Sequence, residues 1–78
     1  MKTFFVVEMM NEKGNSVGYL KDVLRDDGID TEWTVDIHRA IQFDTQKEAQ
    51  DILDGPIDHA LGGKAKNCAV REHAWKQP

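Results

Sequence analysis

The 78 residues are enough for one small folded unit, so we expect a single domain over residues 1–78. Fourteen acidic and ten basic residues give a net charge of −4, which argues against direct binding of nucleic acid or an anionic membrane surface. Cys68 is the one cysteine, which excludes an intramolecular disulfide and favours a reducing compartment.

The first part of the chain predicts a β-hairpin. Residues 3–10 are rich in aromatic and β-branched types, residues 11–15 are turn formers, and residues 16–24 alternate as a returning strand would. Glu8 interrupts the apolar start too early for a secretory signal or a membrane-spanning helix, so we expect a cytoplasmic protein. Asp and Gly residues then predict a loop over residues 25–31.

Two further segments have the period of two that is typical of a strand. Residues 32–38 alternate polar and apolar side chains, so Trp33, Val35 and Ile37 are expected to face inward. Residues 67–76 predict the last strand. Cys68, Val70 and Ala74 share one of its faces, and Arg71, His73 and Trp75 share the other.

Between these two strands the sequence predicts a helix. Thr45 and Glu48 have the spacing of a capping box, and apolar residues recur at helical spacing from Ala49 to Leu61. Gly55 and Pro56 interrupt this stripe and predict a kink, or a second short helix over residues 56–61 that ends at the following glycines. The fold class is therefore α+β: a small antiparallel sheet in the order β-β-β-α-β, with one kinked or split helix packed on one face.

The first strand is apolar on both of its faces. Phe5, Val7 and Met9 fill one face, and the other face carries Phe4, Val6 and Met10 with Glu8 as its one interruption. One helix covers one face of a sheet, so the second face needs another cover. We expect the loop over residues 22–31, a second subunit or a binding partner to provide it.

Motifs that would indicate catalysis or a bound cofactor do not stand out. The three histidines and Cys68 lack the close pairs of a structural zinc site, and Cys68 and His73 point to opposite faces of their strand. A catalytic cysteine needs a positioned base and a pocket, for which so small a core leaves little room. We therefore expect no enzyme, no cofactor and no metal.

The outer side of the predicted helix carries an acidic ridge. Its carboxylates follow one another at intervals of three or four residues: Asp44, Glu48, Asp51, Asp54 and Asp58. A solvated outer face explains this pattern, and so does mimicry of a nucleic-acid backbone, in which carboxylates occupy the phosphate sites of a DNA- or RNA-binding protein.

A resemblance to a protein family rests on four short strings. They are Gly18-Tyr19-Leu20, Trp33-Thr34, Ala40-x-x-Phe43-x-Thr45-x-x-Glu48-Ala49 and Val70-x-x-His73. Together these strings resemble the small orphan proteins of tailed bacteriophages and prophages, over about residues 4–75. The resemblance implies this fold and a phage-like origin, and it transfers no catalytic or binding residue.

Three functional hypotheses follow. The first is a non-enzymatic protein-binding module that inhibits or redirects a host or defence protein. Its predicted contact residues are Phe4, Val6, Met10, Trp33 and Trp75, because aromatic and apolar anchors often dominate interface energy. The second is an acidic mimic of nucleic acid that acts through the ridge. The third is a self-associating structural domain, whose partner is a second copy in a homodimer.

Overall fold

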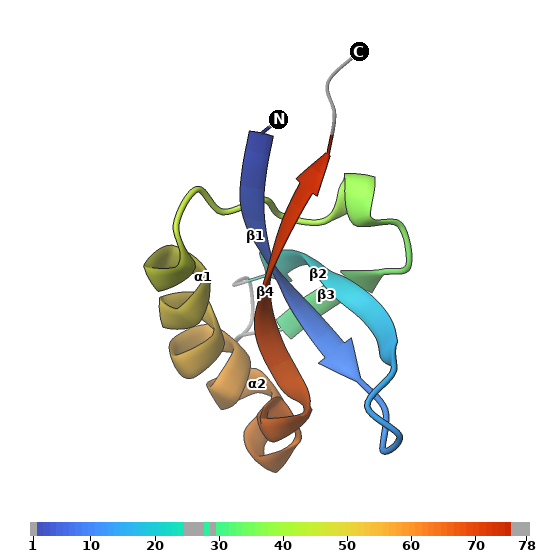
Figure 1. The fold of residues 1–78 in the computed structure, drawn as a ribbon. Helices are drawn as coiled ribbons and strands as arrows, with labels where there is room; N and C mark the ends of the chain where they lie inside the picture. Colours follow the sequence, from blue (N-terminus) through green and yellow to red (C-terminus); the bar gives the residue numbers. More distant parts are fainter. Residues whose placement is uncertain (1, 25–27, 29, 76–78) are drawn as a thin grey trace.

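Four strands form one antiparallel sheet in the order β3-β2-β1-β4 (Figure 1). This computed structural model describes residues 2–24, 28 and 30–75, and at Lys64 and Trp75 it describes only the backbone. The strands are β1 (Lys2–Met10), β2 (Ser16–Leu24), β3 (Asp30–Thr34) and β4 (Cys68–Trp75). A helical segment between β3 and β4 packs on one face of the sheet, which confirms the α+β class and the predicted element order.

The hairpin between β1 and β2 closes as the sequence predicts. The side-chain oxygen of Asn11 accepts hydrogen bonds from the backbone nitrogens of Lys13 at 2.9 Å and Asn15 at 3.0 Å. Gly14 takes a φ of 82°, a left-handed conformation that glycine adopts without steric cost. The turn is thus fixed by one asparagine side chain and one glycine.

The helical segment begins at the predicted cap. Thr45 has an extended backbone, and its hydroxyl accepts a hydrogen bond from the nitrogen of Glu48 at 3.2 Å. The predicted kink at Pro56 takes the form of a wider π turn, because proline has no N–H for the regular ladder. The segment runs through α1 (Gln46–Ile52), η2 (Leu53–Ile57), α2 (Asp58–Leu61) and η3 (Gly62–Asn67).

The third strand is shorter than predicted and begins earlier. It starts at Asp30, inside the predicted loop, of which residues 25–27 and 29 lie outside the described residues, and it ends at Thr34. Asp36 then caps a 3-10 turn, η1 (Ile37–Arg39), by accepting a hydrogen bond from the nitrogen of His38 at 2.9 Å. Because the chain bends here, Val35 does not face inward as its alternation predicted: it is 86% exposed.

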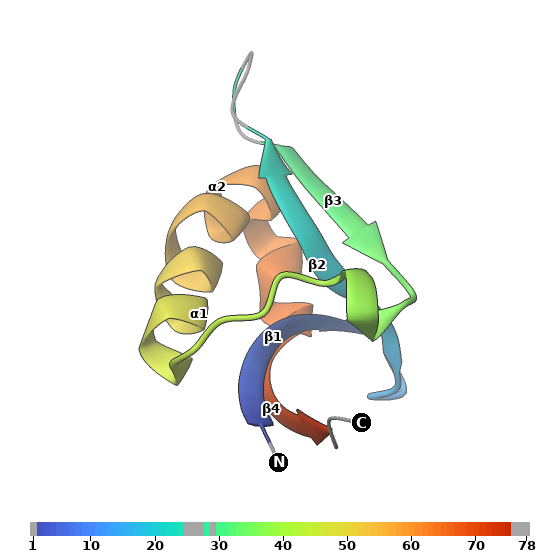
Figure 2. The same cartoon turned by 90° about the horizontal axis from the view of Figure 1, so that it is seen from above.

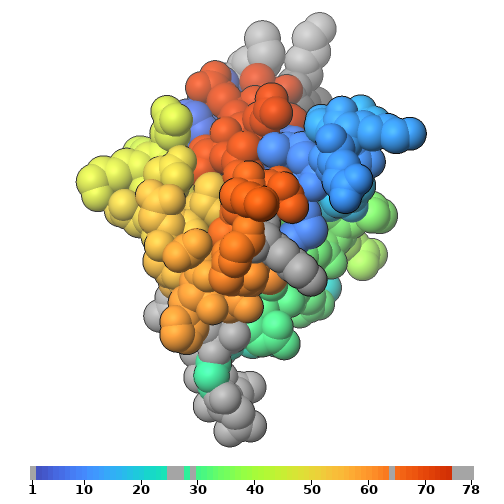
Figure 3. Space-filling view, turned by 90° about the horizontal axis from the view of Figure 1, so that it is seen from below, coloured from blue at the N-terminus to red at the C-terminus, as the bar shows by residue number. Residues whose placement is uncertain are grey.

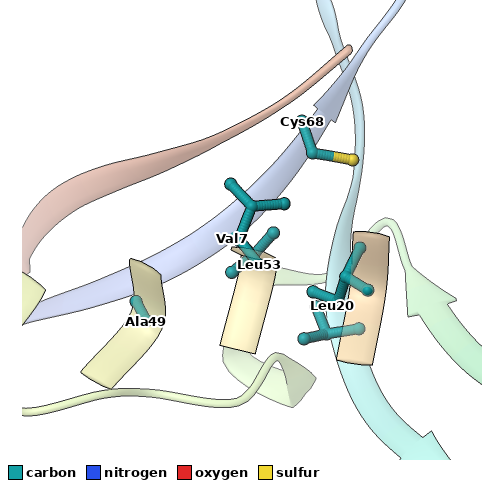
Figure 4. Packing of buried hydrophobic residues seen from close by; sticks show 6 residues of the cluster. Val7, Leu20, Ala49, Leu53 and Cys68 are labelled. Atoms are coloured by element: carbon teal, nitrogen blue, oxygen red, sulfur yellow. The ribbon is translucent and has the colours of Figure 1, made fainter. Parts of the chain in front are cut away.

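The helix covers the first face of the sheet and closes the larger core. Figure 4 shows Val7, Leu20 and Cys68 from the strands directed toward Ala49 and Leu53 of the helical segment. All of these side chains are buried, and Phe5, Met9 and Val70 pack around them. Phe5, Val7 and Met9 of the first strand thus share the face under the helix, together with Cys68 and Val70 of the last strand, whereas Ala74 is exposed.

The chain's own segment after β3 covers Phe4 and Val6 on the second face, where we expected the 22–31 loop, a second subunit or a partner; residues 25–27 and 29 of that loop lie outside the described residues. Phe4 and Val6 are 1% and 0% exposed and form a second core with Ala40, to which Tyr19 and Ile37 add half-buried side chains. Figure 2 shows η1 on the side of the sheet opposite the helices. The bend after β3 is what brings η1 over this face.

After η1 the chain runs between β1 and β2 before it reaches α1. These two strands pair only at Glu8, Met9 and Met10. Further along β1, Phe43 exchanges two backbone hydrogen bonds of 2.8 Å with Phe5, and the nitrogen of Ile41 donates to the oxygen of Leu20 at 2.9 Å. Ala40 belongs to the second core, whereas Ile41 and Phe43 pack on the first, so this segment links both layers.

Candidate interaction surfaces and a carboxylate–imidazole contact

A carboxylate and an imidazole meet on the second face of the sheet. Oε1 of Glu8 lies 2.5 Å from Nε2 of His73, and the two side chains are 9% and 32% exposed. In the register of β1 and β4, Glu8 lies opposite Ala69 and His73 lies opposite Phe4, so the pair spans several residues along the ladder. Figure 2 shows that β1 and β4 curl together along this part of the sheet.

Two aromatic rings hold the imidazole of His73. Phe4 stacks on it with ring centroids 6.0 Å apart and an interplanar angle of 23°. Tyr19 meets it edge-on at 6.2 Å and 83°. Both geometries are favourable for aromatic pairs. The sequence predicted that His73 shares a face with Arg71 and Trp75, but not that it is partly buried and paired.

The acidic ridge is exposed at all five predicted positions: Asp44, Glu48, Asp51, Asp54 and Asp58. Two of these carboxylates have partners on the same helix. Nζ of Lys47 donates to Asp51 at 2.8 Å, and Nε2 of Gln50 donates to Asp54 at 2.9 Å. The hydrogen bond and negative charge of Asp51 raise the pKa of Lys47. In Figure 3 the helical segment forms one side of the molecule, and the β1–β2 hairpin lies on the other.

A small group of apolar side chains remains in solvent at one end of the sheet. Val35 is 86% exposed and Val17 is 48% exposed. The pairing of Tyr19 with Thr34 brings the start of β2 to the end of β3, and the pairing of Met10 with Ser16 brings the end of β1 there too. We call Met10, Val17 and Val35 the apolar corner; Met10 is half-buried.

The predicted contact residues have different environments. Phe4 and Val6 are enclosed by η1 and are not available for docking in this fold. Trp33 is half-buried against the helix-side core, on the inward side that the alternation of residues 32–38 predicted. Its Nε1 donates a hydrogen bond to the hydroxyl of Thr31 at 2.8 Å. The side chain of Trp75 lies outside the described residues. Of the five, Met10 is the one that joins the apolar corner.

Cys68 lies in the helix-side core, where burial raises the pKa of its thiol. A raised pKa disfavours the reactive thiolate, so this environment suits a structural thiol. Among residues 2–24, 28 and 30–75, no three His, Cys, Asp or Glu side chains gather as a metal site would require. None of the described helices is long and apolar enough to cross a membrane.

Comparison with known proteins adds no family to this picture. No protein-family model, no curated protein and no solved structure matches the chain.

Proposed function

We propose that this chain is a non-enzymatic protein-binding module that inhibits or redirects a host or defence protein, and that the apolar corner is its contact surface. The observation that carries the proposal is the exposure of Val35, 86%, and of Val17, 48%, at the same end of the sheet. Its neighbour Asp36 is used to cap η1, so the bend that covers the second face also leaves Val35 in water.

Burial of the corner against a partner supplies a plausible driving force. Removing a fully exposed valine side chain from water contributes about 1.5 to 3 kcal/mol. Two valines and the half-buried Met10 therefore suit the apolar centre of a small interface, and the hairpin loop beside them offers a polar rim in Glu12 and Lys13. The resemblance to phage and prophage proteins supports a bacterial host protein as the partner class.

A pull-down with matched variants tests this proposal. Tagged wild-type chain at micromolar concentration should enrich one specific protein from a bacterial lysate, and the double variant V17S/V35S should lose it at least tenfold. Leu24→Ser is the matched control, because Leu24 is 40% exposed but lies at the other end of β2. Failure of the wild type to enrich any protein, or equal capture by V17S/V35S, would count against the corner as a docking surface.

The exposed ridge favours a second candidate, an acidic mimic that blocks a DNA- or RNA-binding protein. Such a complex should weaken steeply as salt rises, since its contacts are charge pairs near solvent. D51K/D54K should abolish inhibition of the target, while E12K/D22K changes net charge equally away from the ridge and should not. Inhibition that survives D51K/D54K would exclude the mimic. Light scattering after size exclusion separates both candidates from a self-associating structural domain.

A further inference from the structure

The two edges of the sheet differ in length and regularity. β3, at one edge, has five residues, and its pairing with β2 shifts register between Leu20 and Asp22. β4, at the other edge, has eight residues that pair with β1 without a shift in register. Short strands and bulges protect an edge from further pairing, whereas a long regular edge strand is a template for another strand. β4 is therefore the edge that suits a partner.

The hydrogen bonds of β1 determine which backbone groups of β4 point outward. Phe5 exchanges both backbone hydrogen bonds with Phe43 on one side of β1, and it lies opposite Glu72 on the other side. Antiparallel strands alternate hydrogen-bonded and non-hydrogen-bonded pairs, so the N–H and C=O of Glu72 point away from β1. The same alternation turns the backbone groups of Val70 and Ala74 outward.

A contact at the start of β4 agrees with this alternation. The nitrogen of Cys68, two residues before Val70, donates to the oxygen of Ala65 in η3 and not to β1. Within the described part of the chain, the outward groups of Val70, Glu72 and Ala74 have no hydrogen-bond partner. They form a row of donors and acceptors like the one to which an extended peptide adds as a strand.

The charges on β4 decide between a second copy and a different chain. Arg71 and Glu72 are both exposed and lie in the middle of the strand. Two copies related by a twofold axis would pair antiparallel, and the two centred registers would place either Arg71 or Glu72 opposite the same residue of the second copy. Like charges directly opposite each other are destabilising, so a second copy is disfavoured.

We propose that the open edge of β4 binds an extended segment of another protein, which places an acidic residue opposite Arg71 and a basic residue opposite Glu72. The segment adds antiparallel to β4, so its basic residue directly precedes its acidic one. Arg71 then occupies a non-hydrogen-bonded pair, in which opposite side chains are closest. The edge is separate from the apolar corner and binds its segment whether or not the corner has a partner.

Amide hydrogen exchange tests whether the edge is open. In the isolated wild-type protein the amides of Val70, Glu72 and Ala74 should exchange at least about tenfold faster than those of Arg71 and His73, which donate to β1. Protection of the three outward amides would overturn the proposal. Light scattering would then show whether a second copy occupies the edge.

Two synthetic peptides test the charge order. Thr-Thr-Val-Lys-Glu-Val-Thr-Thr should bind with saturable NMR shifts at the amides of Val70, Glu72 and Ala74, and the same peptide with Glu before Lys should bind about tenfold more weakly. The double variant R71E/E72R should reverse this preference. Equal binding of both peptides to the wild type, or binding of neither, would refute the proposal. Because only purified components are used, this failure is distinguishable from failure of the pull-down at the apolar corner.

A proline variant tests pairing through the main chain. Glu72→Pro removes an outward N–H that no described residue accepts, so β4 keeps its hydrogen bonds to β1 but should lose the peptide. Glu72→Gln, the matched control, keeps the N–H and should weaken binding only about threefold. Binding by Glu72→Pro as tight as by Glu72→Gln would contradict strand addition. If Glu72→Pro does not fold, R71E/E72R still decides the outcome.

Discussion

The two faces of the sheet are closed by covers of very different size. On one face the helical segment from α1 to η3 lies over the strands, and the buried side chains there are all apolar or thiol: Val7, Leu20, Ala49, Leu53, Ile57 and Cys68. On the other face a single 3-10 turn covers Phe4 and Val6. The same face also carries the half-buried Tyr19 and the Glu8–His73 pair. The polar pair thus lies on the face that has the smaller cover.

This difference explains why one core tolerates charge and the other does not. A carboxylate under the helix would have no route to a partner or to water, and its burial would be costly. Glu8 has a partner in His73, and because His73 is one-third exposed it connects Glu8 to the surface. A small cover therefore makes room for a polar site, and a large cover excludes one.

The largest expected effect tests whether the second face is a core at all. Phe4→Ala should lower the free energy of unfolding by about 3 to 5 kcal/mol, as much as Leu53→Ala under the helix, because both side chains are buried. For a domain of this size that is most of the stability. Urea unfolding followed by tryptophan fluorescence measures it, with exposed Val35→Ala as the control at less than about 0.5 kcal/mol. A small loss at Phe4 would mean that η1 does not cover this face in solution.

The next effect concerns the polar pair. His73→Leu should lower the free energy of unfolding by about 1 to 3 kcal/mol, because it leaves the buried carboxylate of Glu8 without a partner. The double variant E8L/H73L should recover most of that loss, since a pair replaced by apolar side chains leaves nothing unsatisfied. A double-mutant cycle by urea unfolding measures the coupling. If the stability losses of Glu8→Leu and His73→Leu add up to the loss of the double variant, the contact contributes no coupling energy.

Local chemistry along the chain predicted most of the fold. Asn11 and Gly14 mark the hairpin, Thr45 marks the start of the helix, and the period of two fixes the faces of the first and last strands. Each of these signals acts within a few residues, so it can be read without knowing the rest of the structure. The acidic ridge was predictable for the same reason.

The missed features depend on contacts between distant segments. The alternation around Val35 favours a strand, but capping of η1 by Asp36 ends that strand early and places a cover on Phe4. Glu8 and His73 are in contact although they are not opposite in the register of β1 and β4, so strand pairing alone does not predict the pair. One signal was present in the sequence. A single carboxylate on an apolar face requires a hydrogen-bond partner, and the alternation of side chains along the last strand allows His73 to lie on that face.

Smaller effects distinguish the two covers. Thr45→Ala should lower the free energy of unfolding by about 1 kcal/mol, because it removes the acceptor that caps α1 at the nitrogen of Glu48. Thr45→Ser keeps the hydroxyl and should stay near the wild type. Thermal unfolding by circular dichroism detects the difference. Equal stability of the alanine and serine variants would show that the cap contributes nothing to the helix-side cover.

The smallest effect belongs to the smaller cover. Asp36→Ala should cost about 0.5 to 1 kcal/mol, since it removes the cap of η1 at the nitrogen of His38. The ion pair with Arg39, at 3.8 Å and largely exposed, adds little. Asp36→Asn keeps the accepting oxygen and removes the charge, so it should match the wild type in urea unfolding. If Asp36→Asn loses as much unfolding free energy as Asp36→Ala, the charge of Asp36 and not its hydrogen bond holds η1 over Phe4. The smaller cover would then depend on electrostatics, and the larger cover on a hydrogen-bonded cap.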